Sequence, residues 1–552
     1  MSQSLSSADP KAPDTPNSVV KSAGIVSIAV FSSRITGLVR EQVLAALFGA
    51  SQALDAYRIG FLIPNLTRDL FAEGALSSAF VPIFTEYLSS RSREEAARLA
   101  NLVASAIILV VGTICILGVI FSPFLVAMIA PGFLRSPGKF ELAVQLTRIM
   151  FPFLLMVALA AQAMGILNAC NRFAVPATAS TMFNIGSLIA GLFLGKVVGP
   201  HIGLSEIHGM AWGAVTGGVL QLAWQIPSLR AAGFHFQPTI DWSDPGLRRI
   251  ALLMGPAILG NAAVQINVTV NNNLASHLGD GAVSWLQFAF RFMQLPIGIF
   301  GVAIASATLP AISRSASLQN IPEFRATLSR SLGMVFLLTV PSAVGLAVLG
   351  RSIVAAVYQH GAFQVSDTEQ TSRALSWYAL GLIGYAAIKV INPAFYALKD
   401  SRTPMMISFG SIVVNLVVAL CTVKFLGWGH SGLALSTSAV AIFSAVALFV
   451  IMRNRIGGIY GRNLWSSFVR ITAASCLMGV AVYASSLGIH RALGEQKLTS
   501  FVDLGVSIPL GMAVLWISCR LIGVPELDSA AAALAGPLRR RIPFLGKGRP
   551  VP

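Results

Sequence analysis

Long apolar runs separated by short polar stretches make up most of the chain. Each run is about 20 residues or longer, and a helix of that length crosses the roughly 30 Å hydrocarbon core of a membrane. The pattern therefore predicts fourteen transmembrane helices, the second of which is expected to bend at Pro64. They cover residues 22–48, 53–90, 96–129, 138–168, 175–197, 207–228, 247–277, 281–313, 326–349, 367–398, 404–425, 431–453, 463–488 and 500–523.

The composition supports a membrane protein. Hydrophobic residues make up 55% of the chain and charged residues only 11%, whereas a soluble protein carries roughly a quarter charged residues. The mean hydropathy is +0.73. Residues 1–21 are polar and lack the apolar segment of a signal peptide, so we expect them to form a disordered cytoplasmic tail. The expected fold class is an all-α polytopic membrane protein.

Basic residues concentrate in alternate loops. Because Lys and Arg collect in loops that stay in the cytoplasm, the net charge of +17 has a topological explanation and does not require a nucleic-acid partner. About seven basic residues fall on the other side, among them Arg135, Lys139, Lys196, Arg491 and Lys497. The skew predicts that both termini are cytoplasmic. The cytoplasmic set is Arg91, Arg93, Arg98, Arg172, Arg230, Arg248, Arg249, Arg314, Arg325, Arg330, Lys399, Arg402, Arg453, Arg455, Arg462 and the tail RRRIPFLGKGR.

The two sets of six helices resemble each other. "GALSSAFVP" (74–82) matches "GVAIASATLP" (301–310), and "LNACNRFAVP" (167–176) matches "FYALKDSRTP" (395–404). Pro82 and Pro310, which end the first match, are 228 residues apart, and so are Pro176 and Pro404, which end the second. We call this spacing the repeat offset. Six is an even number, so the copies have the same orientation, as in transporters with parallel repeats around a central site. We expect an N-lobe (22–228), a cytoplasmic linker (229–246), a C-lobe (247–453), two extra helices (463–523) and a basic cytoplasmic tail (524–552).

Charged side chains interrupt the apolar segments. Each costs at least ~2.5–3.5 kcal/mol at the middle of a bilayer, so most should face water or a partner. Arg34 and Glu41, seven residues apart, share a helix face, and Asp55 and Arg58 form an i, i+3 pair. The interrupting residues are Arg34, Arg40, Asp55, Arg58, Arg68, Asp69, Glu73, Arg148, Arg291 and Lys389.

Polar stripes on two helices of the second half complement this cluster. One contains Ser284, Gln287, Arg291 and Gln294, and the other contains Asn261, Gln265, Thr269 and Asn272. Together with the charges of the first half, they predict a hydrated central cavity.

The sign of the predicted cavity points to its cargo. Basic residues outnumber acids among these charges and most are arginine, which binds phosphate in bidentate geometry. The cargo is therefore expected to be anionic and phosphorylated. The alternatives are structural ion pairs for Arg34–Glu41 and Asp55–Arg58, and for Lys389 a contact with a helix-end carbonyl.

The sequence lacks the usual signatures of enzymes and ATP-driven pumps. There is no GxxxxGK[ST] loop, HExxH or CxxC motif, and the seven histidines are scattered. We therefore expect a protein that is not an enzyme and needs no metal or cofactor.

Four segments carry distinctive motifs. They are "SSRITGLVREQVLAALFGASQALDAYRIGFLIPNLTRDLFAEGALSSAFVPIFTEY" at the N-terminal end, "MGPAILG" (254–260), "AVSWLQFAFRFMQLPIGIFGVAIASATLP" (282–310) and "NPAFYALKDSRTP" (392–404). All four resemble the corresponding segments of the MurJ/MviN lipid II flippases. The resemblance covers nearly the whole chain. It implies a flippase of the bacterial inner membrane that moves undecaprenyl-pyrophosphate-linked disaccharide-pentapeptide (lipid II) to the outer leaflet for peptidoglycan synthesis. It also implies that helices thirteen and fourteen form a groove for the lipid tail.

The resemblance assigns site residues. The cavity arginines of the family match Arg34, Arg40, Arg68 and Arg291, and its cavity aspartate matches Asp55. We expect the first four to bind substrate, and Asp55, Glu41, Gln287, Gln294 and Lys389 to support the cavity. The chain departs from the family at Gln294, where a glutamate is common, and at Asp69, where an arginine is common. The first departure disfavours a titrating carboxylate on helix eight.

Other functions remain open at this point. One is an exporter of another anionic lipid-linked oligosaccharide, and another is a drug or cation antiporter, which would need an acid-dominated cavity. A membrane scaffold or a polyprenyl-phosphate enzyme would be a different class of protein. Lipid II and the surrounding membrane lipids are the expected partners, and the protein is expected to act as a monomer.

Overall fold

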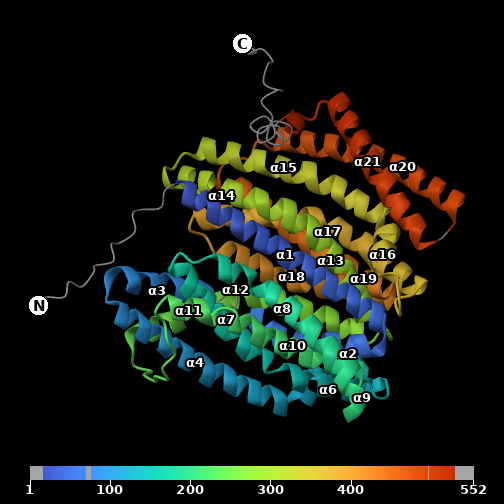
Figure 1. The fold of residues 1–552 in the computed structure, drawn as a ribbon. Helices are drawn as coiled ribbons and strands as arrows, with labels where there is room; N and C mark the ends of the chain where they lie inside the picture. The colour runs from blue at the N-terminus through green and yellow to red at the C-terminus, as the bar shows by residue number, and fades with distance from the viewer. Residues whose placement is uncertain (1–15, 70–75, 495, 529–552) are drawn as a thin grey trace, which may run out of the picture. The chain divides into compact units, whose positions relative to one another are not determined.

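The structure is a computed structural model that describes residues 16–69, 76–494 and 496–528, and within these ranges every regular element is a helix. The first group comprises α1 (Pro16–Phe48), α2 (Gln52–Arg68), α3 (Ser77–Ser90), α4 (Arg93–Ile120), α5 (Ser122–Ile129), η2 (Pro131–Arg135), α6 (Lys139–Met150), α7 (Phe153–Ala169), α8 (Ala174–Leu192), η3 (Phe193–Val198), α9 (Gly199–Ile202), α10 (Glu206–Ala223) and α11 (Ile226–Ala231). The second group comprises α12 (Pro245–Ser276), α13 (Ala282–Pro296), η4 (Ile297–Gly301), α14 (Val302–Ser317), α15 (Ile321–Val348), α16 (Gly350–Tyr358), α17 (Val365–Ala397), α18 (Arg402–Leu420), η5 (Cys421–Phe425) and α19 (His430–Arg455). Helices α20 (Gly461–Leu493) and α21 (Lys497–Ile522) complete the described chain (Figure 1).

The predicted all-α membrane fold is confirmed. Ten helical segments of the described chain are long and apolar enough to cross a membrane, and they coincide with ten of the fourteen predicted segments. The other four predicted segments correspond to α1, to α2 with α3, to α10 and to α12. Fourteen crossings therefore remain a prediction.

Helix boundaries recur along the chain at the predicted repeat offset. Arg93 and Ile120 bound α4, and Ile321 and Val348 bound α15, so both ends of the two helices are separated by that offset. It also relates both ends of α8 to both ends of α18, and a short π-helical segment follows each of them. The structure therefore contains two parallel copies of one helical unit.

The helix caps repeat as well. The Ser92 side chain accepts a hydrogen bond from the Glu95 backbone N–H at the start of α4, and Asn320 does the same for Glu323 at the start of α15. A side chain at this position satisfies a backbone donor that has no partner within the helix. The copies thus begin equivalent helices with the same local chemistry.

The helix pair α5 and α16 was not predicted. Each begins two residues after a long helix ends, and their starts, Ser122 and Gly350, are again separated by the repeat offset. Within an unbroken apolar run, hydropathy does not show where one helix stops and the next begins. The prediction therefore assigned 96–129 to one helix and 326–349 to another with nothing after it.

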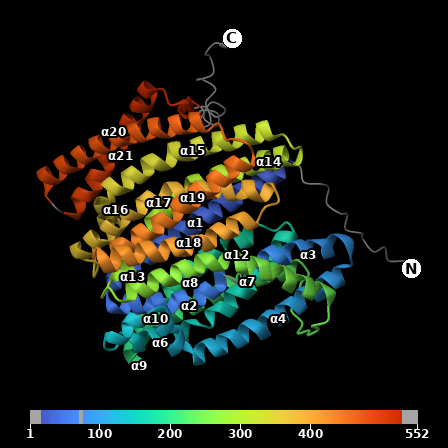
Figure 2. The ribbon, with the colours of Figure 1, turned by 180° about the vertical axis from the view of Figure 1, so that it is seen from behind.

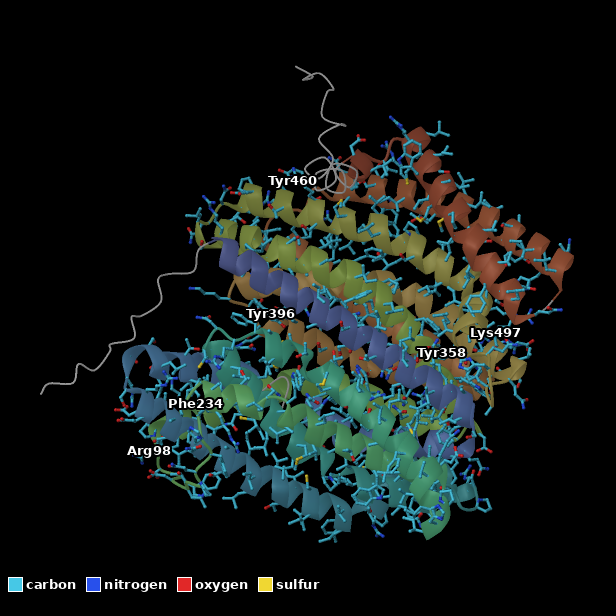
Figure 3. The ribbon with its side chains drawn as sticks, viewed as in Figure 1. Arg98, Phe234, Tyr358, Tyr396, Tyr460 and Lys497 are labelled. Atoms are coloured by element: carbon cyan, nitrogen blue, oxygen red, sulfur yellow. The ribbon has the colours of Figure 1, made fainter. Side chains whose placement is uncertain are left out.

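Contacts between residues divide the chain into two compact units. Unit one comprises residues 1–41, 60–125 and 143–261, and unit two comprises 42–59, 126–142 and 262–552. Several helices, α1, α2, α5, α6 and α12 among them, contribute residues to both. Figure 3 labels Arg98 and Phe234 of unit one and Tyr358, Tyr396, Tyr460 and Lys497 of unit two. The limits predicted for the lobes, linker and tails stay predictions.

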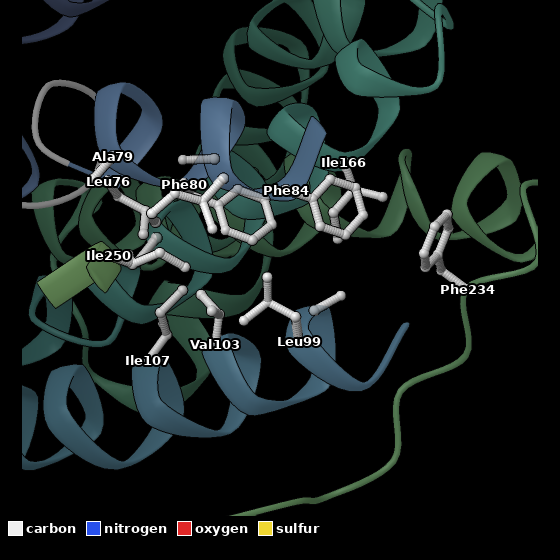
Figure 4. Close-up of a cluster of buried hydrophobic side chains, with 14 of the residues drawn as sticks. Leu76, Ala79, Phe80, Phe84, Leu99, Val103, Ile107, Ile166, Phe234 and Ile250 are labelled. Atoms are coloured by element: carbon white, nitrogen blue, oxygen red, sulfur yellow. The ribbon is translucent and has the colours of Figure 1, made fainter. Parts of the chain in front are cut away.

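Unit one is organised around α7 and α10. Helix α10 packs along α8 and against α7, which in turn contacts α3 and α4. Both ribbon views show α8 beside α10 (Figures 1 and 2). The core contains Phe80 and Phe84 from α3, Leu99 and Val103 from α4, and Phe234 from the segment after α11 (Figure 4).

Unit two is organised around α17. Helices α13, α14, α15, α16 and α19 all pack against it, and α20 packs against both α15 and α21. One apolar cluster of this unit contains Phe324, Leu328, Val390, Phe395 and Leu448. Helix α17 is the counterpart of α6 and α7 in the first copy, since the repeat offset relates Ala169, which ends α7, to Ala397, which ends α17.

Candidate functional site

A buried carboxylate in unit two joins two helices. The Ser51 hydroxyl accepts a hydrogen bond from the Leu54 backbone N–H at the start of α2 and so helps to position Asp55 in the first turn. Asp55 is fully buried. Its Oδ1 accepts hydrogen bonds from the backbone N–H and the hydroxyl of Ser284, at 3.0 and 2.7 Å, and its Oδ2 accepts one from the Gly281 backbone N–H at 2.8 Å. Since α13 has no side-chain cap of its own, Asp55 supplies the anion that its N-terminus favours.

Lys139, at the start of α6, neutralises this carboxylate. Its Nζ lies 2.9 Å from Asp55 Oδ2 and 2.9 Å from Asp280 Oδ1, and both Lys139 and Asp55 are buried. Gln52 Nε2 donates a hydrogen bond of 2.8 Å to Asp280 Oδ2. Partial burial works against ionisation of Asp280, but the hydrogen bonds from Lys139 and Gln52 and the Lys139 charge outweigh it and lower its pKa. We call Gln52, Asp55, Lys139, Asp280 and Ser284 the Asp55 network.

The glycine before α13 brings the chains close together. Gly281 has a φ of +86°, and a Cβ there would lie 2.7 Å from the Ala50 carbonyl oxygen. A larger residue would therefore be strained in its backbone and would collide with the segment that leads into α2. Gly281 thus allows its own N–H to reach Asp55.

The predicted Asp55–Arg58 ion pair is wrong. Asp55 pairs with Lys139, while Arg58 donates from Nη1 to Gln287 Oε1 at 2.7 Å and lies 4.2 Å from the centre of the Phe288 ring. Arg58 is one turn further along α2, where α13 presents an amide and a ring. Tyr358 (Figure 3) is fully buried, and its ring centre is 4.7 Å from that of Phe288.

In unit one, Arg40 is held between aromatic rings and an acid. Its guanidinium carbon lies 5.2 Å from the Phe183 ring centre and 6.0 Å from that of Phe61, and Nη2 is 3.4 Å from Glu41 Oε1. Arg40 and Glu41 are both buried. Glu41 is therefore paired with its neighbour, and the predicted Arg34–Glu41 pair is wrong, because Arg34 is exposed and forms no ion pair with the described residues.

Arg68 ends α2 with an acid beside it. Its Nε and Nη2 lie 3.2 and 2.8 Å from Asp69 Oδ1. Both side chains are partly exposed. The neighbouring residue Glu73, which the charge pattern also selected, lies outside the described residues.

Three further predicted site residues are exposed on unit two. Arg291 and Gln294 are one helical turn apart on α13, and Lys389 lies on α17. The polar stripe predicted for α13 is not uniform, because Ser284 is fully buried while Arg291 and Gln294 are exposed. Gln287 is partly exposed, and its Oε1 accepts a hydrogen bond from Arg58.

The solvent-inaccessible charges of the described chain are of both signs, and the predicted cationic cavity stays a prediction. The buried cations there are Arg40, Arg58 and Lys139, against the acids Glu41, Asp55, Asp367 and Asp503. A buried charge needs a partner, so the two signs nearly balance. Among the predicted site residues, the cations at exposed positions are Arg34, Arg291 and Lys389.

Sequence reasoning missed Lys139 and Asp280. Lys139 counted only as a basic residue of a loop, and Asp280 lies in the short connection before α13. One signal could have found the contact, since Gln52 and Asp280 are separated by 228 residues, which is the repeat offset.

Two parallel copies of a membrane-spanning helical unit, with charged side chains held inside it, define a polytopic membrane transporter. In fold, the chain is similar to a MATE-family multidrug transporter in an inward-facing conformation, with a TM-score of 0.65, 15% identity and coverage of 77% of this chain and 94% of that one. A solved structure titled lipid II flippase MurJ, inward closed conformation, is more similar. Its TM-score is 0.74 at 29% identity, with 90% of this chain and 98% of that chain covered.

Sequence comparison identifies the family. The profile of the family described as lipid II flippase MurJ matches residues 44–501. The lipid II flippase MurJ of Burkholderia cenocepacia is 35% identical over 78% of this chain and 82% of its own length. The probable lipid II flippase MurJ of Vibrio cholerae is 33% identical over 93% and 98%. The chain belongs to the lipid II flippase MurJ family, a family of transporters, and is a multi-span protein of the bacterial inner membrane.

Proposed function

We propose that this protein is a lipid II flippase, which moves undecaprenyl-pyrophosphate-linked disaccharide-pentapeptide from the inner to the outer leaflet for peptidoglycan synthesis. The observation that carries the proposal is the match to relatives of that name over nearly the full length of both chains. The repeat fold of the structure is consistent with transport by alternating access. A bare pyrophosphate cannot cross hydrocarbon at an acceptable free energy, so the protein has to replace its hydration.

Arginine side chains would bind the headgroup. Arg34 and Arg291 are exposed and can offer bidentate hydrogen bonds to phosphate oxygens. Arg40 and Arg68 each have an acid beside them, which orients the guanidinium and offsets part of its charge. We assign these four arginines to substrate binding and Gln294 and Lys389 to supporting contacts.

The supporting residues have different roles. Glu41 orients Arg40, Gln287 orients Arg58, and Asp55 holds the start of α13. These residues position the site, and the fully buried Asp55 does so without contact with substrate. The groove for the polyprenyl tail is assigned to α20 and α21, as the resemblance implies.

The membrane potential can provide direction. Each negative charge that moves outward gains about 2.3 kcal/mol per 100 mV when the inside is negative. A pyrophosphate carries at least two such charges. Collapse of the potential at fixed ion gradients should therefore stall flipping, and unchanged flipping would exclude this drive.

The experiment that tests the function is depletion of the protein in its own cell, followed by a leaflet-specific probe for lipid II. We expect lipid II to accumulate in the inner leaflet, with rescue by the wild type and by Arg249→Gln, and loss of rescue with Arg291→Gln or Arg34→Gln. Arg249 is a matched control because it forms an exposed ion pair with Glu86. An unchanged leaflet distribution on depletion would exclude lipid II as the cargo.

Topology and assembly belong to the same proposal. Both termini lie in the cytoplasm and the protein works as a monomer. Reporter fusions at each end that become accessible from outside the cell membrane would contradict the first part, and crosslinking of functional protein into dimers would contradict the second.

A further inference from the structure

A second fully buried carboxylate, Asp503, lies in α21, one of the two helices that the repeat does not include. Asp503 Oδ2 accepts hydrogen bonds from the hydroxyls of Ser352 in α16, at 2.5 Å, and Ser486 in α20, at 2.7 Å. Its Oδ1 accepts one from Ser507 in α21 at 2.7 Å. Three helices therefore meet at one carboxyl group through hydroxyl donors alone.

Within the described residues, His490 is the one basic side chain at ion-pair distance from Asp503. Its Nε2 lies 3.5 Å from Asp503 Oδ2 and 3.2 Å from Ser352 Oγ. Hydroxyl groups carry no charge, so they cannot neutralise a carboxylate that is buried in the protein. A buried charge there needs a cation or a proton, and His490 can supply either by holding or giving up its own proton.

The histidine also connects this carboxyl group to a small cavity. His490 lines a cavity of about 30 Å³ together with Arg351, Gln359 and Gln496, which is enough for a water molecule. The His490 Nδ1 atom is buried and has no hydrogen-bond partner among the described protein atoms. Protons can therefore reach the imidazole from the cavity, while Asp503 itself is sealed from water.

Several other charged groups belong to the elements around this site. Arg351 of α16 pairs with Glu369 of α17 at 3.8 Å. His360 follows α16, Arg491 follows His490 in α20, and Lys497 begins α21 (Figure 3). Apart from Glu369, which pairs with Arg351, these groups are basic, and none of the acids among the described residues lies at hydrogen-bond distance from Asp503.

The equivalent position in the first copy shows that this arrangement is specific. Phe124 of α5 corresponds to Ser352 of α16 at the repeat offset, and 66% of its surface is exposed. In the second copy this position of the short helix carries a hydroxyl, the helix packs against α21, and the hydroxyl also contacts His490 of α20. The polar cluster thus replaces an apolar surface where the two extra helices dock.

We propose that His490, Ser352 and Asp503 form a proton-binding site that controls how α20 and α21 dock on α16. As the pH falls, the imidazole takes up a proton from the cavity at Nδ1, and the imidazolium then gives its Nε2 proton to Ser352 Oγ while the Ser352 hydroxyl proton moves to Asp503 Oδ2. The products are a neutral imidazole, an intact hydroxyl and a carboxylic acid, so the atoms and charges balance. In the acid form Asp503 donates a hydrogen bond instead of only accepting them, which rearranges the contacts among the three helices.

The direct test is infrared difference spectroscopy of the full-length protein in nanodiscs, taken between two pH values from 5 to 8. We expect a carbonyl band of a protonated carboxylic acid to appear together with imidazole bands. Asp503→Asn should remove the carbonyl band, His490→Gln should remove the imidazole bands, and Ser352→Ala should uncouple the two. Asp528→Asn, which changes an exposed acid, should leave the spectrum unchanged.

The result that overturns the proposal is a wild-type difference spectrum that Asp503→Asn and His490→Gln leave unaltered. Both variants keep hydrogen-bonding side chains of similar size, and size-exclusion profiles and thermal unfolding check that they are folded. If one of these variants does not fold, Ser352→Ala is the alternative test, because it changes no charge and should still uncouple the carbonyl band from the imidazole bands.

A transport assay links the site to activity, and this part rests on the proposed lipid II function. In proteoliposomes at a fixed potential, the wild-type rate should change with the pH on the side of Lys497, and His490→Gln should flatten that profile. Spectral bands without any lipid II movement would reject the proposed function and keep the proton site. Lipid II movement with identical wild-type and variant pH profiles would reject proton control.

Discussion

The two copies of the helical unit share their helix boundaries but not their chemistry. Lys139 begins α6 in the first copy, and the residue at the repeat offset from it, near the start of α17, is Asp367. Lys139 binds two carboxylates, whereas Asp367 accepts hydrogen bonds from the Trp285 indole N–H and the Gln364 backbone N–H. The same place in the fold therefore holds a cation in one copy and an anion in the other.

The difference extends to the helices that carry the candidate site. Arg40 and Glu41 of α1 correspond to Val268 and Thr269 of α12 at the same offset. Helix packing depends on the spacing of apolar side chains, which both copies retain, whereas a charged pair needs only a few positions. A duplicated scaffold can therefore keep its architecture while one copy alone acquires the charges.

The largest effect is expected from the Asp55 network. Lys139→Met leaves the fully buried Asp55 without its cation, and removing one partner of a buried pair costs about 3–5 kcal/mol. Thermal or denaturant unfolding in detergent should show a strongly destabilised protein. Asp55→Leu combined with Lys139→Met should recover part of the loss, and a double variant as unstable as the two single losses added together would contradict pairing as the cause.

A smaller loss is expected where α2 and α13 meet. Gln287→Leu removes the acceptor that lies 2.7 Å from Arg58 Nη1. An unsatisfied charged donor costs about 1–3 kcal/mol, and the same unfolding measurement detects it. Gln287→Glu keeps an acceptor, so it should be less destabilising than Gln287→Leu, and the reverse order would show that this contact is not stabilising.

The second copy should tolerate the equivalent change better than the first. Asp367→Ala removes a helix cap and one indole partner, and loss of a cap costs about 0.5–2 kcal/mol. Its destabilisation should therefore be smaller than that of Lys139→Met. Equal losses in the two variants would mean that the stability of the two copies depends equally on this position, and the copies would then not differ in this respect.

The smallest effect is a dependence on acid. The pKa of Asp280 is lowered below its ordinary value of 3.8, so its ionised form stabilises the folded state above about pH 3.8, and that contribution is lost as the pH falls through the lowered value. Because 45% of its side chain is exposed, the effect should be modest. Asp280→Asn should flatten the stability profile in this range, and an unchanged profile would contradict the assignment.

Much of the fold follows from the apolar pattern, because a run of membrane length has few alternatives to a helix. The predicted boundaries of α15, α17 and α18 agree with the structure within a few residues, except for the start of α15 and the end of α18, after which η5 continues to Phe425. The pattern failed at α5 and α16, where two helices share one apolar run. It failed there because hydropathy describes only the polarity of the side chains, whereas the break between two helices depends on the backbone conformation.

The candidate site was harder to predict, because its pairings join residues that are distant in the chain. The charge pattern selected Arg40, Glu41 and Asp55, and all three are buried. It could not select their partners, since Lys139 comes from a separate segment and looks like an ordinary loop residue. The i, i+3 rule suggested Arg58 for Asp55, but a helix neighbour is only the nearest candidate, and tertiary contacts decide.

The contact between Gln52 and Asp280 has a consequence for how such a protein can evolve. In a dimer of one such unit, a residue on the symmetry axis meets its own copy, and a charge that meets itself is repelled. Once the two copies are joined in one chain, the residue on each side of that contact can mutate separately. An amide can then face a carboxylate and a lysine can bridge two acids, so the fused chain can carry polar pairings that a symmetric dimer could not hold.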